Sequence, residues 1–306
     1  VDLDVADVDG VGKAEIVLGE AGGLKAFPAE PATEAWTAGC AYQPAATGVR
    51  LLSLEALDLD GDGRAEVFAT HHNEFFSRVE TVVLDCRAGA FTPLATLPWM
   101  VRSVWDAQGR RSLAAQALVS DGSFPFGAIY PLRHAEGKYQ LGSPALRAKR
   151  LEWIYSFART ETAAGDGPSA VFYDKNGRLR AVLGKKSWTS PEPLGQTSNR
   201  IRWHERLLRF APRLPTIGSE KGFAGVYAIR NQPRLGTLAE AFGVYGKGEV
   251  QRLRWNGLSL EPEWTAEADG YVAGIAVGDA PGAPVYAAIV GAGGSTAVWK
   301  FAAAAP

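Results

Sequence analysis

The sequence lacks any apolar run that approaches the ~20 residues needed by a membrane-spanning helix. It also lacks a strong charge of either sign, because 32 lysines and arginines stand against 33 aspartates and glutamates. No global field therefore favours nucleic acid or an anionic membrane surface as a partner. Helical periodicity is nearly absent as well. The best candidates for helices are the short stretches 200–210 and 238–242.

Cysteine is scarce, with only Cys40 and Cys86 in the chain. Their wide separation excludes a haem-attachment motif and a paired zinc-binding motif. Two interpretations stay open: a disulfide, if the protein is exported to an oxidising compartment, or two separate buried thiols. The chain begins at Val1 instead of Met, so we expect a mature or trimmed form in which a signal peptide is not visible.

What the sequence does contain is a compact acidic stretch at 58–66, between two apolar segments. Carboxylates at alternate positions, Asp58, Asp60 and Asp62, can converge on one centre if the backbone curls. Gly61 and Gly63 permit that curl, because glycine tolerates positive φ. Several oxygen ligands at short spacing suit Ca²⁺ better than a softer metal.

Two other interpretations of this stretch compete with calcium binding. An EF-hand loop needs a glutamate at its twelfth position, where this sequence has Ala69, so an EF-hand is excluded. A plain Asp-Gly turn is the simpler alternative. However, the three aspartates and Glu66 would repel one another without a cation, which favours the metal.

The acidic stretch has an earlier copy. Segment 5–18 aligns with 56–69 without a gap at an offset of 51 residues (58 minus 7). Asp7, Asp9 and Glu15 match the acidic residues 58, 60 and 66, whereas Val11 stands in place of Asp62. The first copy therefore retains most of the ligand set.

Weaker copies follow along the chain, each with apolar segments separated by Gly, Pro or Asn-Gly turns. Repeats of roughly fifty residues with four strand-like segments each are typical of a β-propeller. We therefore predict an all-β fold, a single β-propeller of four-stranded antiparallel blades over 1–306, with six blades or, as the alternative, seven. The approximate blades are 1–53, 54–100, 101–150, 151–221, 222–269 and 270–306. An insertion near 193–218 lengthens the fourth.

These repeats resemble the FG-GAP/VCBS repeats of integrin-like propellers, most specifically at 1–19 and 54–70. The later segments 151–159 and 270–273 are similar to exported VCBS-repeat proteins of Gram-negative bacteria. The resemblance implies structural Ca²⁺ and an exported protein, periplasmic, outer-membrane-associated or extracellular. The ligands that it implies are Asp58, Asp60, Asp62, Glu66 and the backbone carbonyl of Arg64 in one loop, and Asp7, Asp9 and Glu15 in the other.

Other conspicuous residues have ordinary interpretations. His71 and His72 lack a third metal ligand nearby, and we interpret them as hairpin surface. The run of arginines is interpreted as a solvated loop, with an anionic partner as the alternative; its members are Arg200, Arg202, Arg206, Arg209 and Arg213. The tryptophans could stack on sugars, but packing between blades is the commoner use.

The sequence holds no nucleophile elbow, zincin motif or phosphate-binding glycine loop. We therefore predict a non-enzymatic binding or scaffolding module with a protein or glycan partner. The alternative is a hydrolase or lyase that acts on polysaccharide in the central channel. A third possibility is a subunit of a cell-surface assembly or filament. It is motivated by the last blade, which ends at its third strand, 296–301, and leaves an edge for upstream sequence or a partner to cover.

Overall fold

The computed structural model describes residues 1–20, 22–30, 36–44, 48–106, 108–118, 126–146, 152–160, 169–219, 222–234, 243–278 and 282–302. Within these residues the regular structure is β-strand apart from one short 3₁₀ turn, η1 (Ile154–Ser156). The all-β prediction is confirmed. In the same residues, no helix has the length and apolarity required to cross a membrane.

The strands follow one another as antiparallel meanders. The first eight are β1 (Asp2–Ala6), β2 (Glu15–Glu20), β3 (Gly23–Pro28), β4 (Cys40–Tyr42), β5 (Val49–Leu57), β6 (Glu66–Asn73), β7 (Arg78–Arg87) and β8 (Ala90–Leu97). They form one sheet of order β1-β2-β3-β4-β8-β7-β6-β5. Because β4 and β8 are joined only by the parallel pair of Ala41 and Ala90, the sheet consists of two four-stranded meanders that touch at their outer strands.

The remaining sheets are separate. The next two contain β9 (Met100–Trp105), β10 (Arg111–Leu118), β11 (Phe126–Ala135) and β12 (Lys138–Leu141), and then β13 (Phe157–Thr160), β14 (Ser169–Tyr173), β15 (Arg178–Leu183) and β16 (Lys186–Pro193). A two-stranded hairpin follows, β17 (Arg200–Trp203) and β18 (Arg206–Arg209). The last two contain β19 (Thr216–Ser219), β20 (Gly222–Pro233), β21 (Tyr245–Trp255) and β22 (Leu260–Ala268), and then β23 (Tyr271–Val277), β24 (Val285–Val290) and β25 (Thr296–Phe301).

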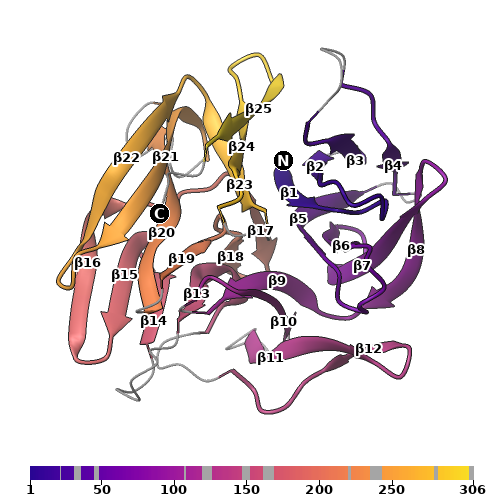
Figure 1. Cartoon of the computed structure of the whole chain (residues 1–306), viewed down its shortest axis with the longest axis horizontal. Coiled ribbons are helices and arrows are strands. Elements are labelled where there is room, and N and C mark those ends of the chain that lie inside the picture. The colour runs from indigo at the N-terminus through magenta and orange to yellow at the C-terminus, as the bar shows by residue number, and fades with distance from the viewer. Residues whose placement is uncertain are drawn as a thin grey trace.

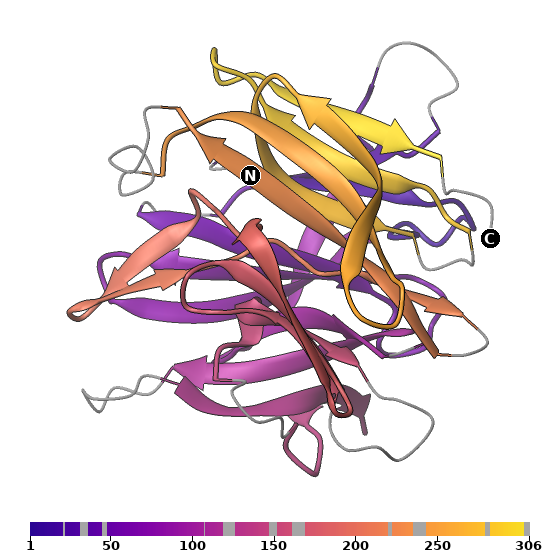
Figure 2. The ribbon, with the colours of Figure 1, turned by 90° about the vertical axis from the view of Figure 1, so that its left-hand side faces the viewer.

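The sheets are arranged like the blades of a propeller, with the first strands of the meanders toward the centre (Figure 1). Strand β1 packs against both β5 and β23, while β9 packs against β5 and β13. The beginning and end of the chain are thereby brought together. Figure 2 shows the long strands β20, β21 and β22 side by side on the face that lies at the left of Figure 1.

The core lies between neighbouring sheets, not on one side of a single sheet. One apolar cluster joins β1 and β2 to β23 and β24. It contains Leu3, Ile16, Ala276 and Tyr286. Inner strands such as β1 and β9 are buried along their whole length, because both of their faces meet another sheet. Outer strands alternate in burial, as β25 does, because one face meets solvent.

The helix predicted at 200–210 is wrong, since this segment forms the hairpin β17–β18. Its buried residues Ile201, Trp203 and Leu208 follow the two-residue period of a strand, and His204 at φ 49° closes the tight turn. The insertion near 193–218 is therefore not a plain loop. The other predicted helix, 238–242, lies outside the described residues.

The last sheet, β23–β25, has three strands within the described part of the chain. This agrees with the expectation that the chain ends at the third strand of its last repeat. What covers the edge of β25 stays a prediction.

Candidate functional site: acidic loops and a charged centre

The loop between β5 and β6 curls as the sequence predicts. Gly61 and Gly63 adopt φ of 82° and 87°. The carboxylate of Asp58 accepts the N–H of Gly61 at 2.7 Å and that of Gly63 at 3.0 Å. Asp60 accepts the N–H of Asp62 at 3.0 Å. The glycines thus allow the backbone to wrap around the first aspartate of the loop.

Three of the four predicted carboxylates in this loop come together. Oxygen atoms of Asp58, Asp60 and Glu66 lie within 4.8 Å of one another, and Glu66 is buried. Asp62 is not in this group; its Oδ1 accepts the N–H of Arg64 at 2.9 Å. The side chain of Arg64 instead lies 3.9 Å from Asp85.

The loop between β1 and β2 has the same geometry. Asp7 accepts the N–H groups of Gly10 and Gly12 at 2.8 and 2.7 Å, and oxygens of Asp7, Asp9 and Glu15 lie within 4.8 Å of one another. Glu15 accepts the N–H of Val8 at 2.9 Å, just as Glu66 accepts that of Leu59 at 2.8 Å in the other loop. The Val-for-Asp difference at position 11 therefore leaves the three-carboxylate group intact.

The donor set of each loop is chemically suited to a hard cation. All three side chains offer oxygen, and among the described residues no lysine or arginine forms an ion pair with either group. Burial raises the pKa of Glu15 to about 7, against the opposing effect of the Val8 N–H, and burial likewise raises the pKa of Glu66. Carboxylates buried in this way without a protein cation are left to be neutralised by a proton or a metal.

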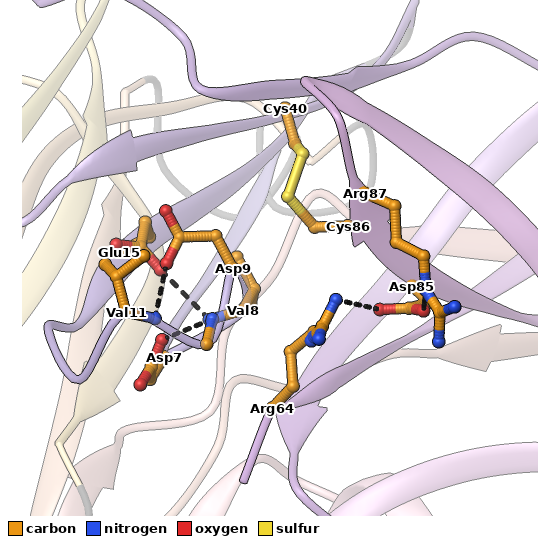
Figure 3. Close-up of a disulfide and its surroundings, with 11 residues drawn as sticks. Asp7, Val8, Asp9, Val11, Glu15, Cys40, Arg64, Asp85, Cys86 and Arg87 are labelled. Atoms are coloured by element: carbon orange, nitrogen blue, oxygen red, sulfur yellow. Dashed lines mark hydrogen bonds and ion pairs between the residues drawn. A yellow bond between two sulfur atoms is a disulfide. The ribbon is translucent and has the colours of Figure 1, made fainter. Parts of the chain in front are cut away.

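The two loops are linked to each other. The N–H of Ala65, just before Glu66, donates to the carbonyl of Asp7 at 2.7 Å. A disulfide joins Cys40 on β4 to Cys86 on β7, with the Cα atoms 6.0 Å apart. Figure 3 shows the first acidic loop and the side chain of Arg64 beneath this disulfide. The question left open by the sequence is thus answered in favour of the bond.

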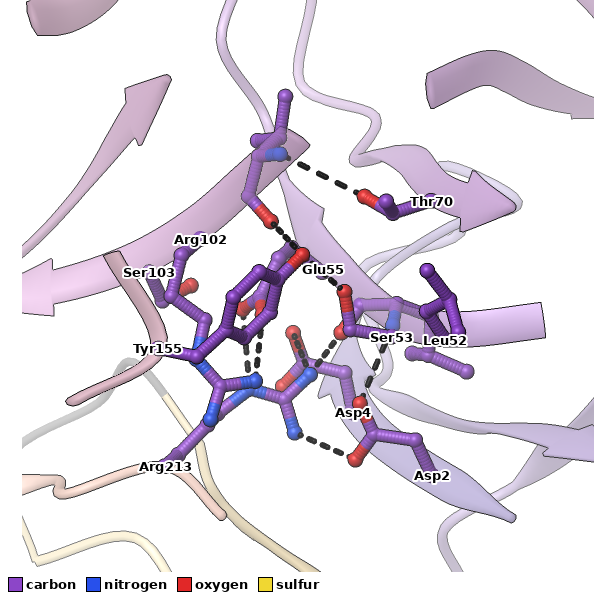
Figure 4. A network of polar contacts seen from close by, with 12 residues as sticks. Asp2, Asp4, Leu52, Ser53, Glu55, Thr70, Arg102, Ser103, Tyr155 and Arg213 are labelled. Carbon is purple, nitrogen blue, oxygen red and sulfur yellow. Dashed lines mark hydrogen bonds and ion pairs between the residues drawn. The ribbon is translucent and has the colours of Figure 1, made fainter. Parts of the chain in front are cut away.

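A second charged group lies at the centre of the molecule, and sequence reasoning missed it. Asp2 and Asp4 on β1 and Glu55 on β5 meet Arg102 on β9 and Arg213 in the segment before β19 (Figure 4). Asp4 and Glu55 are 1% and 0% exposed. Buried carboxylates of this kind require partners, and each of them has an arginine here.

Arg213 connects the elements around this centre. Its Nε lies 2.9 Å from Glu55, one terminal nitrogen lies 3.2 Å from Asp2, and the other lies 3.8 Å from Asp4. The same guanidinium donates to backbone carbonyls of Leu3 on β1, Leu54 on β5 and Ile275 on β23. It therefore ties together three of the central strands.

The other two arginines of the group add further contacts. Arg102 Nη1 lies 3.2 Å from Glu55, its Nη2 donates to the carbonyl of Ala211 at 2.8 Å, and its guanidinium lies 5.0 Å from the ring centre of Tyr155. Arg111 on β10 reaches both Asp4 and Glu55. Burial alone would raise the pKa of Glu55, but the charges of Arg213, Arg102 and Arg111 together hold that pKa below its usual value.

A sequence signal for this group exists in the repeat. Asp4 and Glu55 are 51 residues apart (55 minus 4), the same offset that relates the two acidic loops. Each has apolar residues on both sides, Leu3 and Val5 around Asp4, and Leu54 and Ala56 around Glu55. The positive partners carry no such signal, because Arg213 lies in the insertion. The prediction of a solvated arginine run is wrong for Arg213, which is 3% exposed.

The histidine prediction is also wrong. His71 and His72 on β6 are 4% and 9% exposed, because β6 lies between sheets and is covered on both faces. Nδ1 of His71 has no hydrogen-bond partner, and burial lowers the pKa of this side chain to about 4.

Comparison with protein-family models and with curated proteins returned no match. Among solved structures, two of a point mutant of Aleuria aurantia lectin are similar, one with Fucα1-6GlcNAc and one with α-methyl-L-fucoside. Their TM-scores are 0.47 and 0.48 at 11% identity, covering 97% and 98% of this chain and 91% and 90% of the lectin chains. A Thermus thermophilus protein described as an oxidoreductase (glucose dehydrogenase) has a TM-score of 0.43 and 14% identity, with coverage of 97% and 99%. Likeness at this level carries no argument about ligand or activity.

Proposed function

We propose that this chain is a six-bladed, calcium-stabilised β-propeller of FG-GAP/VCBS type that acts as a non-enzymatic binding or scaffolding module for a protein or glycan partner. Six blades are supported by the strand groups β1–β4, β5–β8, β9–β12, β13–β16, β19–β22 and β23–β25. The hairpin β17–β18 is an insertion between the fourth and fifth.

The main support for a non-enzymatic role is that the central carboxylates are buried and paired with arginines. A polysaccharide hydrolase or lyase working in the central channel would need accessible acidic groups there. Asp2, Asp4 and Glu55 do cluster at the centre, but they are buried and paired with arginines. Glu55 in particular is a poor general acid, because the charges of the arginines hold its pKa below its usual value. The surfaces left for function are the faces and clefts around the ring.

Calcium is supported by the two matching three-carboxylate groups and by their lack of an ion-paired arginine or lysine in the described residues. Asp58, Asp60 and Glu66 would hold one ion and Asp7, Asp9 and Glu15 the other. The role is structural, since each ion would fix the turn between the first two strands of a blade.

Export is supported by the Cys40–Cys86 disulfide, since such bonds persist in oxidising compartments. The periplasm, the outer-membrane surface and the extracellular medium all satisfy this condition.

A role as a subunit of an assembly is supported by the edge of the last sheet. Strand β25 pairs with β24 and, among the described strands, with no other. An added strand from upstream sequence or from a partner would complete the fourth position of that blade.

A combined binding and turnover assay tests the proposal. The purified protein is applied to a glycan array and incubated with a panel of polysaccharides, while reducing ends and unsaturated products are followed. Binding without product release is expected. Product release that is retained on purification and abolished in a Glu55→Gln variant that still unfolds cooperatively would instead establish the central-channel enzyme.

A further inference from the structure

A cleft of about 630 Å³ lies between the sheet β9–β12, the sheet β13–β16 and the inserted hairpin β17–β18. Phe126 at the start of β11, Trp153 beside η1, and Phe172 at the end of β14 contribute aromatic walls. Leu207 and Arg209 on β18 also line the cleft. The volume is in the range of small-molecule sites. The insertion thus builds one side of a cleft that the repeats alone would not make.

The aromatic side of the cleft is held in a fixed position. The ring centre of Trp153 lies 4.8 Å from that of Phe126 and 5.2 Å from that of Tyr155. The indole N–H of Trp153 donates to the carbonyl of Arg209 at 2.7 Å. Because this bond uses the only polar atom of the indole, what Trp153 offers to a ligand is its apolar ring. Such a ring stacks on the C–H face of a pyranose.

Two polar groups on the cleft lack partners. Tyr173 is 6% exposed, and its hydroxyl makes no hydrogen bond. The Nε of Arg180 is buried without a hydrogen-bond acceptor, and the guanidinium lies 6.0 Å from the ring centre of Phe172. Among the described residues no carboxylate forms an ion pair with Arg180. Buried donors left unpaired are costly, so a ligand that supplies acceptors would be favoured.

The charged residues that line the cleft favour an acidic ligand over a neutral one. Lys175, Arg180 and Arg209 are cationic, and Glu152 and Asp174 are anionic. One oxygen of Asp174 already accepts the N–H groups of Asn176 and Arg178 and so serves the turn of its own hairpin. The lining thus carries three cationic against two anionic residues, and among them Arg180 has a planar fork that is shaped for a carboxylate.

From the fixed aromatic wall, the unpaired donors and the positive charge, we infer that this cleft binds an acidic saccharide, with the sugar ring against Trp153 and a uronic-acid carboxylate on Arg180. The inference rests on the proposed function as a binding module and names its ligand class. An acidic peptide is the competing occupant and is an outcome of the test below.

The test measures binding of a galacturonic-acid hexamer and of a neutral gluco-oligosaccharide of equal length by titration calorimetry, with tryptophan fluorescence as a second readout. Arg180→Gln is expected to weaken binding of the acidic hexamer at least tenfold and to leave the neutral one unchanged. Leu207→Glu, at an exposed position of the cleft, should weaken the acidic hexamer in the same way without touching the core. Arg254→Gln is the control, because Arg254 is a strand arginine of another sheet and is exposed to solvent.

Uronates also bind calcium, so the acidic loops must be separated from the cleft. Asp60→Ala is expected to leave the affinity for the hexamer unchanged. The inference is overturned if Arg180→Gln and Leu207→Glu both bind like the wild type, if only Asp60→Ala loses binding, or if an acidic peptide binds the cleft and the hexamer does not. Those results would leave the binding-module proposal standing. Cleavage of the hexamer would instead overturn the non-enzymatic proposal while retaining the cleft.

Discussion

Alternating carboxylates occur twice within the first repeat, and their negative charge is compensated differently in the two places. Asp2 and Asp4 on β1 point into the dry centre, where arginines from distant parts of the chain neutralise them. Asp7 and Asp9, a few residues later, lie in a loop at the edge of the sheet, where their hydrogen-bond donors among the described residues are backbone N–H groups. The same contrast separates Glu55 from Asp58 and Asp60 in the second repeat.

The difference shows where the protein uses its own arginines to compensate carboxylates. In the centre, water is excluded, and an unpaired carboxylate would be prohibitively costly, so the compensating charges are built in. At the loops a cation can arrive from solvent. The pKa of Glu55 follows this division, because arginines hold it low, whereas burial raises that of Glu15 to about 7. The pKa of Asp2 does not, because burial outweighs the charge of Arg213 and raises it.

The largest effect is expected from Arg213→Met. Its removal leaves Asp2, Asp4 and Glu55 with too few positive partners, and breaking a buried pair in this way costs about 3–5 kcal/mol. Chemical denaturation would measure the loss. Arg202→Met, at an exposed position of the same insertion, is the control and should stay within about 0.5 kcal/mol of the wild type. Equal stability of the two variants would contradict a central role for Arg213.

The buried side chain of His71, which forms no ion pair with the described residues, should respond to acid. His71 has a pKa of about 4 in the folded protein and 6.5 when unfolded, so between these values only the unfolded chain takes up the proton. Stability is therefore full above pH 6.5 and falls as the pH drops toward 4, by up to about 3 kcal/mol. Denaturation curves across this range would measure the slope.

His71→Leu should flatten that slope, and His204→Asn, in an exposed turn, should not. Buried His72 acts in the same direction, because burial lowers its pKa as well. An unchanged slope in His71→Leu would show that other groups set the acid response.

The calcium side of the comparison is tested by chelation. A site filled at one hundred times its Kd stabilises by about 2.7 kcal/mol, so a chelator should lower the melting temperature of the wild type by several degrees. Asp60→Ala should respond less, and Asp9→Ala combined with Asp60→Ala should not respond. Asp62→Ala is the control within the loop, because Asp62 lies outside the carboxylate group. A wild type indifferent to chelator would remove the calcium assignment.

The smallest effect concerns a contact between blades. Tyr139 on β12 donates its hydroxyl proton to Glu66 at 2.8 Å, which orients a proposed ligand. Tyr139→Phe should cost about 1 kcal/mol and weaken the calcium response of the second loop only. Tyr130→Phe, on the neighbouring strand of the same sheet, is the control. Calorimetric calcium titration of the two variants would decide the matter, and identical titrations would leave Tyr139 without a role in the loop.

Much of the strand pattern could be predicted from the sequence, because a turn can be recognised from the few residues that form it. The hairpin turns at Asn176-Gly177 and Asn256-Gly257 lie between β14 and β15 and between β21 and β22, as expected. The segment 200–210 was misjudged because its arginines hide a two-residue period of buried Ile201 and Trp203. The surface prediction for His71 and His72 is wrong because it assumes a strand with one face in solvent. Strand β6 has no solvent-exposed face.

The sequence by itself determined the curl of the acidic loops, since aspartates and glycines a few residues apart act on their own backbone. It also determined the repeat and its strands. Only the tertiary structure decided which charges meet at the centre, because Asp2, Glu55, Arg102 and Arg213 come together only when the sheets are arranged around one axis. The aromatic cleft depends on the same closure. Short-range hydrogen bonds can be inferred from sequence spacing, whereas the pairing of distant charges depends on which strands the fold makes neighbours.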